Sequence, residues 1–114
     1  MSDCLFCQIV AGQVPAKVAA ESDNSLAFYD IAPQAPVHVL VVPKRHFDGV
    51  NDVTPKFPEV FDDLMFLAQE VTRLEGIRES GYRLVFNSGE DGQQTVKHLH
   101  VHVLGGRRMA WPPG

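Results

Sequence analysis

The sequence predicts a single-domain α+β protein built on a mainly antiparallel five-stranded sheet, with one long and one short helix. Short apolar or alternating segments of strand length recur along the chain, and hairpin-length links join several of them. One central segment instead places its apolar residues at helical spacing. A chain of 114 residues with 45% apolar and 21% charged content is large enough for one hydrophobic core.

The first half of the chain predicts a short helix followed by three strands. Gly12 is a typical C-terminal stop for the helix. The turn residues at 22–25 join two strands into a hairpin, and the prolines at 33 and 36 make the next link rigid. The expected elements are a helical turn at 5–10 and strands at 17–21, 26–31 and 38–42.

The second half predicts one long helix and two further strands. The helix begins between Thr54 and Pro58, where a proline in the first turn costs no hydrogen bond, and Gly76 ends it. The expected strands are 82–87 and 98–104, joined by a polar, glycine-containing loop. The order is therefore β-β-β-α-β-β in one domain of residues 1–114.

Charge and hydropathy narrow the class of function. Ten basic against fourteen acidic residues give a net charge of −4, which argues against a general nucleic-acid binder. The apolar runs are too short to span a bilayer, and residues 1–20 lack the pattern of a signal peptide. Two cysteines do not make a disulfide scaffold. We expect a cytoplasmic protein that binds neither membranes nor nucleic acid.

The segment from His98 to Leu104 carries the strongest chemical signal. It alternates with period 2, so as a strand it would present His98, His100 and His102 on one face and apolar side chains on the other. Three imidazoles can supply a nucleophile and hydrogen-bond donors, or they can bind a metal. The preceding loop adds donors for phosphate oxygens. A P-loop nucleotide site is excluded because the sequence has no Walker-type motif.

This segment resembles the His-φ-His-φ-His-φ-φ signature of the histidine-triad (HIT) family, where φ is an apolar residue. The rest of the chain is similar to that family's Hint branch, the purine nucleoside phosphoramidate hydrolases. The similarity covers residues 9–16, 26–36, 41–46, 82–87 and 92–114. It implies a HIT-like fold whose protomers pair into a homodimer with a continuous sheet. The tail 105–114 would then lie at the dimer interface.

The resemblance implies hydrolysis of a purine nucleoside 5′-phosphoramidate, such as AMP linked to an amine, through a nucleotidyl-histidine intermediate. His100 would be the nucleophile, and His102 would stabilise charge on the phosphoryl oxygens. The Thr95 hydroxyl would contact the leaving group, His38 would assist proton transfer, and His98 would connect the triad to a metal site. No organic cofactor is expected.

The same resemblance assigns residues that bind the nucleotide. Asp30 would accept hydrogen bonds from the ribose hydroxyls, Asn87 would contact the ribose–phosphate region, and Gln94 would be a further donor to phosphate. Trp111 would reach towards the active site of the partner subunit. Apolar residues would form the purine pocket, although each could equally serve core packing: Phe6, Ile9, Val14, Phe28, Ile31 and Leu40.

Two positions depart from the Hint pattern. Gln93 stands where the most similar Hint sequences have glycine, so the backbone near the phosphate could differ. Thr95 replaces the more usual serine, which keeps the hydroxyl and adds a methyl group. Neither change removes a group that the chemistry needs.

Cys4-x-x-Cys7 admits three interpretations. A redox dithiol would be expected in a thioredoxin-like βαβ unit, which this chain lacks. The two cysteines could instead be structural and buried. By resemblance to bacterial-type HIT proteins, the third is a structural Zn²⁺ site, tetrahedral, formed by Cys4, Cys7, His46 and His98.

Three other functions stay open at this stage. The chain could catalyse another HIT reaction, such as dinucleoside polyphosphate cleavage or nucleotidyl transfer. It could also be a nucleotide-binding scaffold protein, or a hydrolase that uses a metal on the three triad histidines. The charged pairs Lys44-Arg45 and Arg107-Arg108 are expected to be solvated.

Overall fold

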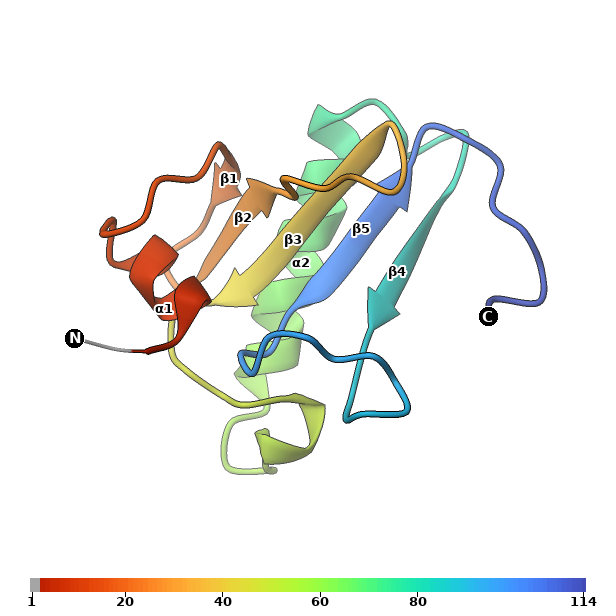
Figure 1. Ribbon diagram of the computed structural model, residues 1–114. Helices are drawn as coiled ribbons and strands as arrows, with labels where there is room; N and C mark the ends of the chain where they lie inside the picture. Colours follow the sequence, from red (N-terminus) through yellow and green to blue (C-terminus); the bar gives the residue numbers. More distant parts are fainter. Residues whose placement is uncertain (1–2) are drawn as a thin grey trace.

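The computed structural model describes residues 3–114 and confirms the predicted α+β architecture and element order (Figure 1). Its strands are β1 (Val18–Glu21), β2 (Ser25–Tyr29), β3 (Val37–Pro43), β4 (Tyr82–Phe86) and β5 (Val101–Gly105). Its helices are α1 (Leu5–Val10), the 3-10 turn η1 (Val50–Asp52) and α2 (Glu59–Leu74).

The five strands form one sheet in the order β1-β2-β3-β5-β4, and each neighbouring pair is antiparallel. Strand β3 lies at the centre, where Leu40 pairs with Phe28 on β2 and with His102 on β5. Because side chains of paired residues point to the same face, this register brings the purine-pocket candidates of β2 and β3 beside the triad histidine of β5.

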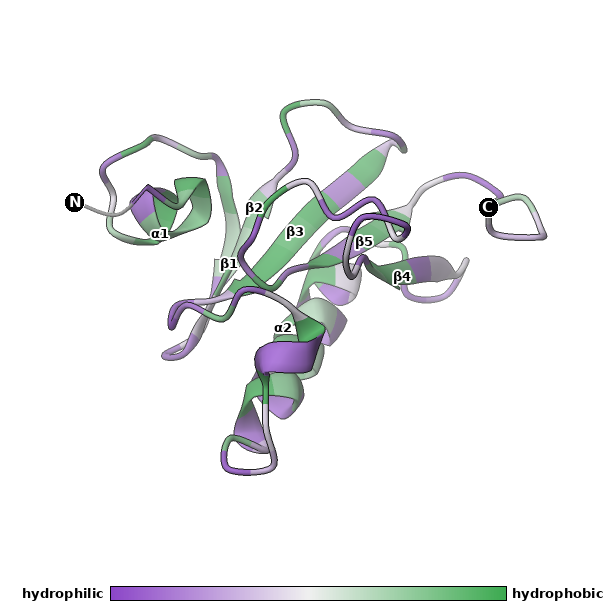
Figure 2. Cartoon of the chain, turned by 60° about the horizontal axis from the view of Figure 1, so that its bottom comes forward, coloured by the Kyte–Doolittle hydropathy of each residue, from purple (hydrophilic) through white to green (hydrophobic). Residues whose placement is uncertain are grey.

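Each face of the sheet packs against a different helix. Figure 2 shows that β3 is mostly hydrophobic, whereas α2 alternates between hydrophobic and hydrophilic sides. The apolar side of α2, including Leu64, Ala68 and Val71, packs on one face of the sheet. On the other face, Phe6 of α1 packs against Phe28 with ring centroids 5.4 Å apart. None of the helices in residues 3–114 has the length and apolar character needed to cross a membrane.

Helix α2 begins one residue after the predicted range. Pro58 occupies its N-cap position, and the acidic Glu59 and Asp62 lie in its first turn, where they interact favourably with the helix dipole. Its end is as predicted, because Gly76 adopts a φ of 70° immediately after the C-cap.

The strand predicted at 98–104 is shorter than expected. Strand β5 begins at Val101, so His98 and His100 precede it. The ladder to β3 stops at the Val41–Val101 pair because Pro43 has no N–H to donate. The Leu99 N–H instead donates to the carbonyl oxygen of Phe47 at 2.7 Å.

The alternation of side chains nevertheless continues through this irregular segment. Leu99, Val101 and Val103 all belong to the core beneath α2. The rings of His98 and His100 lie on the opposite side, where both contact Phe6 edge-to-face. The sheet therefore separates a dry core from a face that carries the histidines.

Candidate active site

A pocket of about 300 Å³ opens on the histidine face, between α1, β2 and β5. Most of its lining is apolar, and a few polar residues complete it, as is usual for small-molecule sites. Ten predicted site residues line it: Phe6, Ile9, Val14, Phe28, Asp30, Ile31, Leu40, Thr95, His100 and His102. Five lining residues were not predicted: Leu5, Pro15, Ala16, Tyr29 and Val96.

A hydrogen bond of the His100 ring shows which of its two nitrogens carries the proton. His100 Nδ1 lies 2.7 Å from the carbonyl oxygen of His98. A carbonyl oxygen can only accept, so Nδ1 carries the proton and the neutral ring keeps its lone pair on Nε2. Burial is the main cause that lowers the pKa of His100. The ring is therefore held as a neutral potential nucleophile on the wall of the pocket.

His38 and His102 form a second histidine pair, beside His100. The backbone N–H of Gln34 donates to His38 Nδ1 at 3.0 Å, and His38 Nε2 lies 2.9 Å from His102 Nδ1. Burial, the neighbouring His100 and the neighbouring His38 lower the pKa of His102 to about 4, against the opposing effect of Asp30. Burial also lowers the pKa of His38. Both rings are neutral at pH 7.

Asp30 is oriented by the turn that follows β2. Its Oδ1 accepts from the Ala32 N–H at 2.8 Å, and its Oδ2 lies 3.5 Å from His38 Nε2. The Asp30 N–H donates to the carbonyl oxygen of His38 at 3.0 Å. The carboxylate is thus fixed at the rim of the pocket, with lone pairs left for a ligand.

Three predicted ligand contacts lie outside the pocket lining. The Gln94 amide donates to the carbonyl oxygens of Asp48 and Val96 at 2.7 and 3.1 Å, so both of its N–H groups hold loops together. Asn87 Nδ2 donates to the carbonyl oxygen of Gly92 at 2.7 Å. Trp111 is 80% exposed on the C-terminal tail, with Arg83 over its ring.

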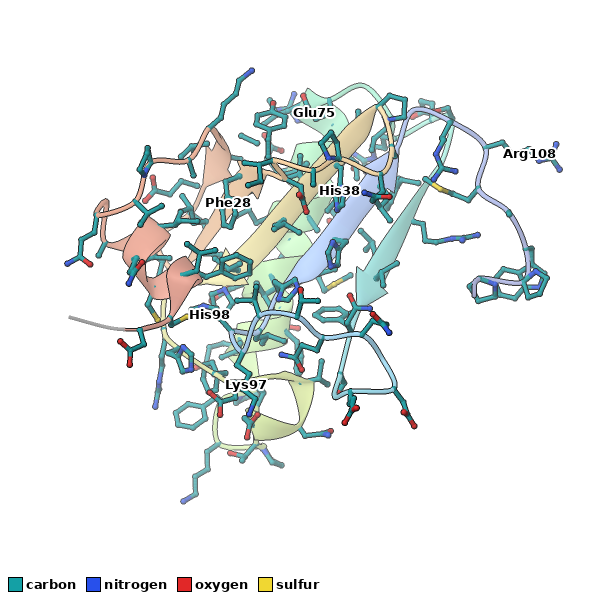
Figure 3. The ribbon with its side chains drawn as sticks, viewed as in Figure 1. Phe28, His38, Glu75, Lys97, His98 and Arg108 are labelled. Atoms are coloured by element: carbon teal, nitrogen blue, oxygen red, sulfur yellow. The ribbon has the colours of Figure 1, made fainter. Side chains whose placement is uncertain are left out.

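Four side chains that could hold a metal ion come together near the N-terminal end of α1: Cys4, Cys7, His46 and His98. His46 Nδ1 lies 3.3 Å from Cys7 Sγ and 3.1 Å from His98 Nδ1, and Cys4 Sγ lies 3.3 Å from His98 Nδ1. These separations approach the edges of a tetrahedron around Zn²⁺, which are roughly 3.3–3.8 Å for nitrogen and sulfur ligands. Figure 3 shows His98 beside α1, at the opposite end of β3 from His38.

The outer hydrogen bonds of the two imidazoles fit metal binding. His98 Nε2 lies 2.8 Å from the carbonyl oxygen of Pro43, and His46 Nε2 lies 2.7 Å from a carboxylate oxygen of Asp48. Both acceptors place the proton on Nε2 and leave the Nδ1 lone pairs facing each other. Metal-binding histidines typically donate their outer N–H to a carbonyl or carboxylate oxygen in this way, which fixes the ring orientation.

A second group, formed by Asp30, His38 and His102, is also compact enough to chelate. Here the Gln34 N–H occupies His38 Nδ1, so the proton of the neutral ring is on Nε2, the atom that faces His102. A metal at this position would have to displace that proton. The tautomers therefore favour metal binding at the cysteine cluster and hydrogen bonding at His38.

Comparison with known proteins identifies the family of this chain. The HIT domain family model matches residues 11–109. An uncharacterized HIT-like protein of Synechococcus elongatus is 45% identical over 112 residues, covering 98% of this chain and 97% of that protein. A HIT family hydrolase from Legionella pneumophila has a TM-score of 0.95 and 49% identity, covering 98% of this chain and 100% of its own. A histidine triad protein from Clostridium difficile has a TM-score of 0.93 and 38% identity, with 96% of each chain covered. The chain therefore belongs to the HIT domain family.

Proposed function

We propose that this protein is a hydrolase that cleaves the P–N bond of purine nucleoside 5′-phosphoramidates and releases a nucleoside monophosphate and an amine. The observation that carries the proposal is the bond from His100 Nδ1 to the His98 carbonyl oxygen, at 2.7 Å. It leaves a neutral Nε2 lone pair on a ring that lines a nucleotide-sized pocket. The similarity to named HIT family hydrolases supports this class of reaction.

In the first step, His100 Nε2 attacks phosphorus, a P–Nε2 bond forms, and the bond to the amine breaks. The departing nitrogen takes one proton from solvent water, passed through the exposed Thr95 hydroxyl at the pocket. His102 donates its Nε2–H to a phosphoryl oxygen, where negative charge must be stabilised. The purine lies among Phe6, Phe28 and their apolar neighbours.

In the second step, water attacks phosphorus from the side that the amine has left. A P–O bond forms, the P–Nε2 bond breaks, and one proton of the water returns to solvent. The His100 ring regains its neutral form with the proton still on Nδ1. Asp30 accepts hydrogen bonds from the ribose hydroxyls throughout, so that phosphorus stays aligned with Nε2.

We further propose a structural Zn²⁺ at Cys4, Cys7, His46 and His98. Four protein ligands would fill its coordination sphere, so the ion would stabilise the fold and take no part in the reaction. Its chemical contribution, when bound, is to fix His98. Because His98 supplies the carbonyl oxygen that holds His100, the ion would support the nucleophile indirectly.

The partner expected from the sequence is a second copy of this chain. We propose that two protomers pair through the edge of β4, which is the last strand of the sheet. Tyr82 is exposed on that strand, and the neighbouring tail carries the exposed Trp111. An unpaired edge with apolar neighbours is a suitable surface for pairing strands. Trp111 would then reach the partner's pocket.

The test is intact-protein mass spectrometry after brief mixing with an AMP-phosphoramidate, comparing the wild type with His100→Asn. We expect a transient AMP adduct that maps to His100 in the wild type, and none in the variant. Turnover by the variant should fall at least about a thousandfold, as for loss of other enzymatic nucleophiles. Turnover that survives the substitution would overturn the covalent mechanism.

A matched substrate comparison separates the proposal from the other HIT reactions. The wild type is given an AMP-phosphoramidate and a diadenosine polyphosphate at equal concentration. We expect a higher kcat/KM for the phosphoramidate. Preference for the dinucleotide would favour polyphosphate cleavage, and binding of AMP without turnover of either substrate would favour a scaffold role.

A further inference from the structure

A chain of hydrogen bonds connects the C-terminal segment to the active-site histidines. Arg107 Nη2 donates to the carbonyl oxygen of Gln34 at 3.0 Å. The backbone N–H of Gln34 in turn donates to His38 Nδ1 at 3.0 Å. His38 Nε2 lies 2.9 Å from His102 Nδ1. Residue 34 is therefore held on one side by a guanidinium group and holds an imidazole on the other.

This arrangement sets the tautomers of two rings. The Gln34 N–H can only donate, so His38 Nδ1 must be unprotonated and the proton of the neutral ring lies on Nε2. His38 Nε2–H then donates to His102 Nδ1. The proton of His102 is consequently on its own Nε2, the donor that the proposed mechanism needs at the phosphoryl group.

The backbone brings Arg107 to this position. Gly106 has a φ of 88° and lies so close to the turn that a Cβ added to it would be 2.9 Å from Pro36 Cβ. A larger residue would push the chain away from the turn. The turn itself also orients Asp30, through the Ala32 N–H. The turn after β2 thus orients both Asp30, the proposed ribose ligand, and the ring of His38.

We propose that Arg107 is a positioning residue that holds Gln34, and through it the tautomers of His38 and His102. From the sequence alone, the Arg107-Arg108 pair is expected to be solvated, with no contact assigned to it. Arg108 differs from Arg107 in that its side chain extends away from the domain (Figure 3). Only the kinetic consequence of this proposal rests on the proposed function.

The test is ring ¹⁵N NMR of the histidines at pH 7, which distinguishes protonated from unprotonated ring nitrogens. In the wild type we expect an unprotonated Nδ1 and a protonated Nε2 on both His38 and His102. Arg107→Ala should move both rings towards a mixture of tautomers, and Arg107→Lys should restore part of the wild-type pattern. Arg108→Ala is the matched control and should leave the pattern unchanged.

The kinetic readout is the hydrolysis of an AMP-phosphoramidate by the same variants. Loss of one hydrogen bond to a charged group at an exposed site predicts that kcat falls about threefold to tenfold in Arg107→Ala. KM should stay within about twofold, because Arg107 does not line the pocket. Arg107→Lys should recover part of kcat.

The outcomes are distinct. Ring signals of His38 and His102 that are identical in the wild type and Arg107→Ala would overturn the proposal, as would an equal change in Arg108→Ala. A protonated His38 Nδ1 in the wild type would overturn it as well. A tautomer change in a protein that hydrolyses no phosphoramidate would uphold the positioning role and reject the proposed function.

Discussion

The Nδ1 atoms of His46 and His98 lie 3.1 Å apart, and each ring has its proton on the opposite nitrogen. Two lone pairs at this distance repel each other unless a cation lies between them. Cys4 and Cys7 bring two sulfur atoms to the same point. The relationship between these two rings is therefore the strongest physical argument for a bound metal.

The first prediction concerns that metal. We expect the purified protein to contain about one zinc ion per chain by elemental analysis, and Cys7→Ser to contain much less. The Tm of Cys7→Ser should fall by on the order of 10 °C, because a structural metal contributes folding free energy.

Asp48→Asn is the graded control, since it keeps the four ligands and changes only the acceptor at His46 Nε2. Its zinc affinity should fall by roughly tenfold to a hundredfold. Zinc content that is equal in the wild type and Cys7→Ser would contradict the site.

The second prediction concerns the stability of the fold at low pH. The folded pKa of His102 is about 4, whereas the unfolded value is about 6.5. Between these values the unfolded chain binds more protons, so the free energy of unfolding falls as the pH falls from about 6.5 to about 4.

His102→Gln should show a shallower decline over that range, measured by urea unfolding at several pH values. Groups that do not interact with His102 contribute equally to both chains and cancel in the comparison, whereas the difference between the chains includes the coupling of His102 to His38 and His100. Two parallel curves would show that His102 is not the group responsible.

The third prediction concerns recognition of the ribose. Asp30→Asn removes the charge that would accept from both hydroxyls, so KM for a ribonucleotide phosphoramidate should rise about tenfold or more. The same substitution should raise KM for the 2′-deoxy substrate by a smaller factor, because only the 3′-hydroxyl is left to contact Asp30. Equal effects on both substrates would mean that Asp30 acts elsewhere, for example on His38.

The fourth prediction concerns the loop before the triad. Gln93 has a φ of 61°, a conformation that costs about 1–2 kcal/mol for residues with a side chain. After allowing for the greater flexibility of unfolded glycine, Gln93→Gly should stabilise the protein by about 0.5–1 kcal/mol in urea unfolding.

Gly92→Ala, in the same loop, is a control that should change the stability in the opposite direction. A Cβ at residue 92 would collide with the carbonyl oxygen of Ser88, so this substitution should destabilise the protein by about 1–3 kcal/mol. Destabilisation by Gln93→Gly would indicate that the glutamine side chain makes a contribution larger than the backbone strain.

The alternation of His98 to Leu104 was sufficient to predict which side chains point together, but not how the backbone pairs. Side-chain direction follows from a period of 2, which the segment keeps even outside β5. Pairing depends on the partner strand, and Pro43 ends the ladder before it reaches Leu99. The pattern of one strand does not reveal its partner strand, so the point at which Pro43 would end the pairing could not be predicted.

The predicted site residues also fall into two groups: those whose position follows from the alternation along a strand, and those whose contacts depend on the surrounding backbone. Apolar pocket residues such as Phe28 and Leu40 follow from strands whose faces could be predicted. Gln94 was assigned by its residue type as a phosphate donor, whereas its amide is used by the carbonyl oxygens of Asp48 and Val96. Gln34 was missed because its contribution is a backbone N–H, which leaves no signal in the side chain.

That backbone N–H has a consequence for how sequences of this type can change. An amide proton bears no formal charge and belongs to every residue except proline. Position 34 can therefore accept many amino acids while the atom that orients His38 stays the same. A position that varies freely among relatives, yet never becomes proline, would be the evolutionary trace of this hydrogen bond.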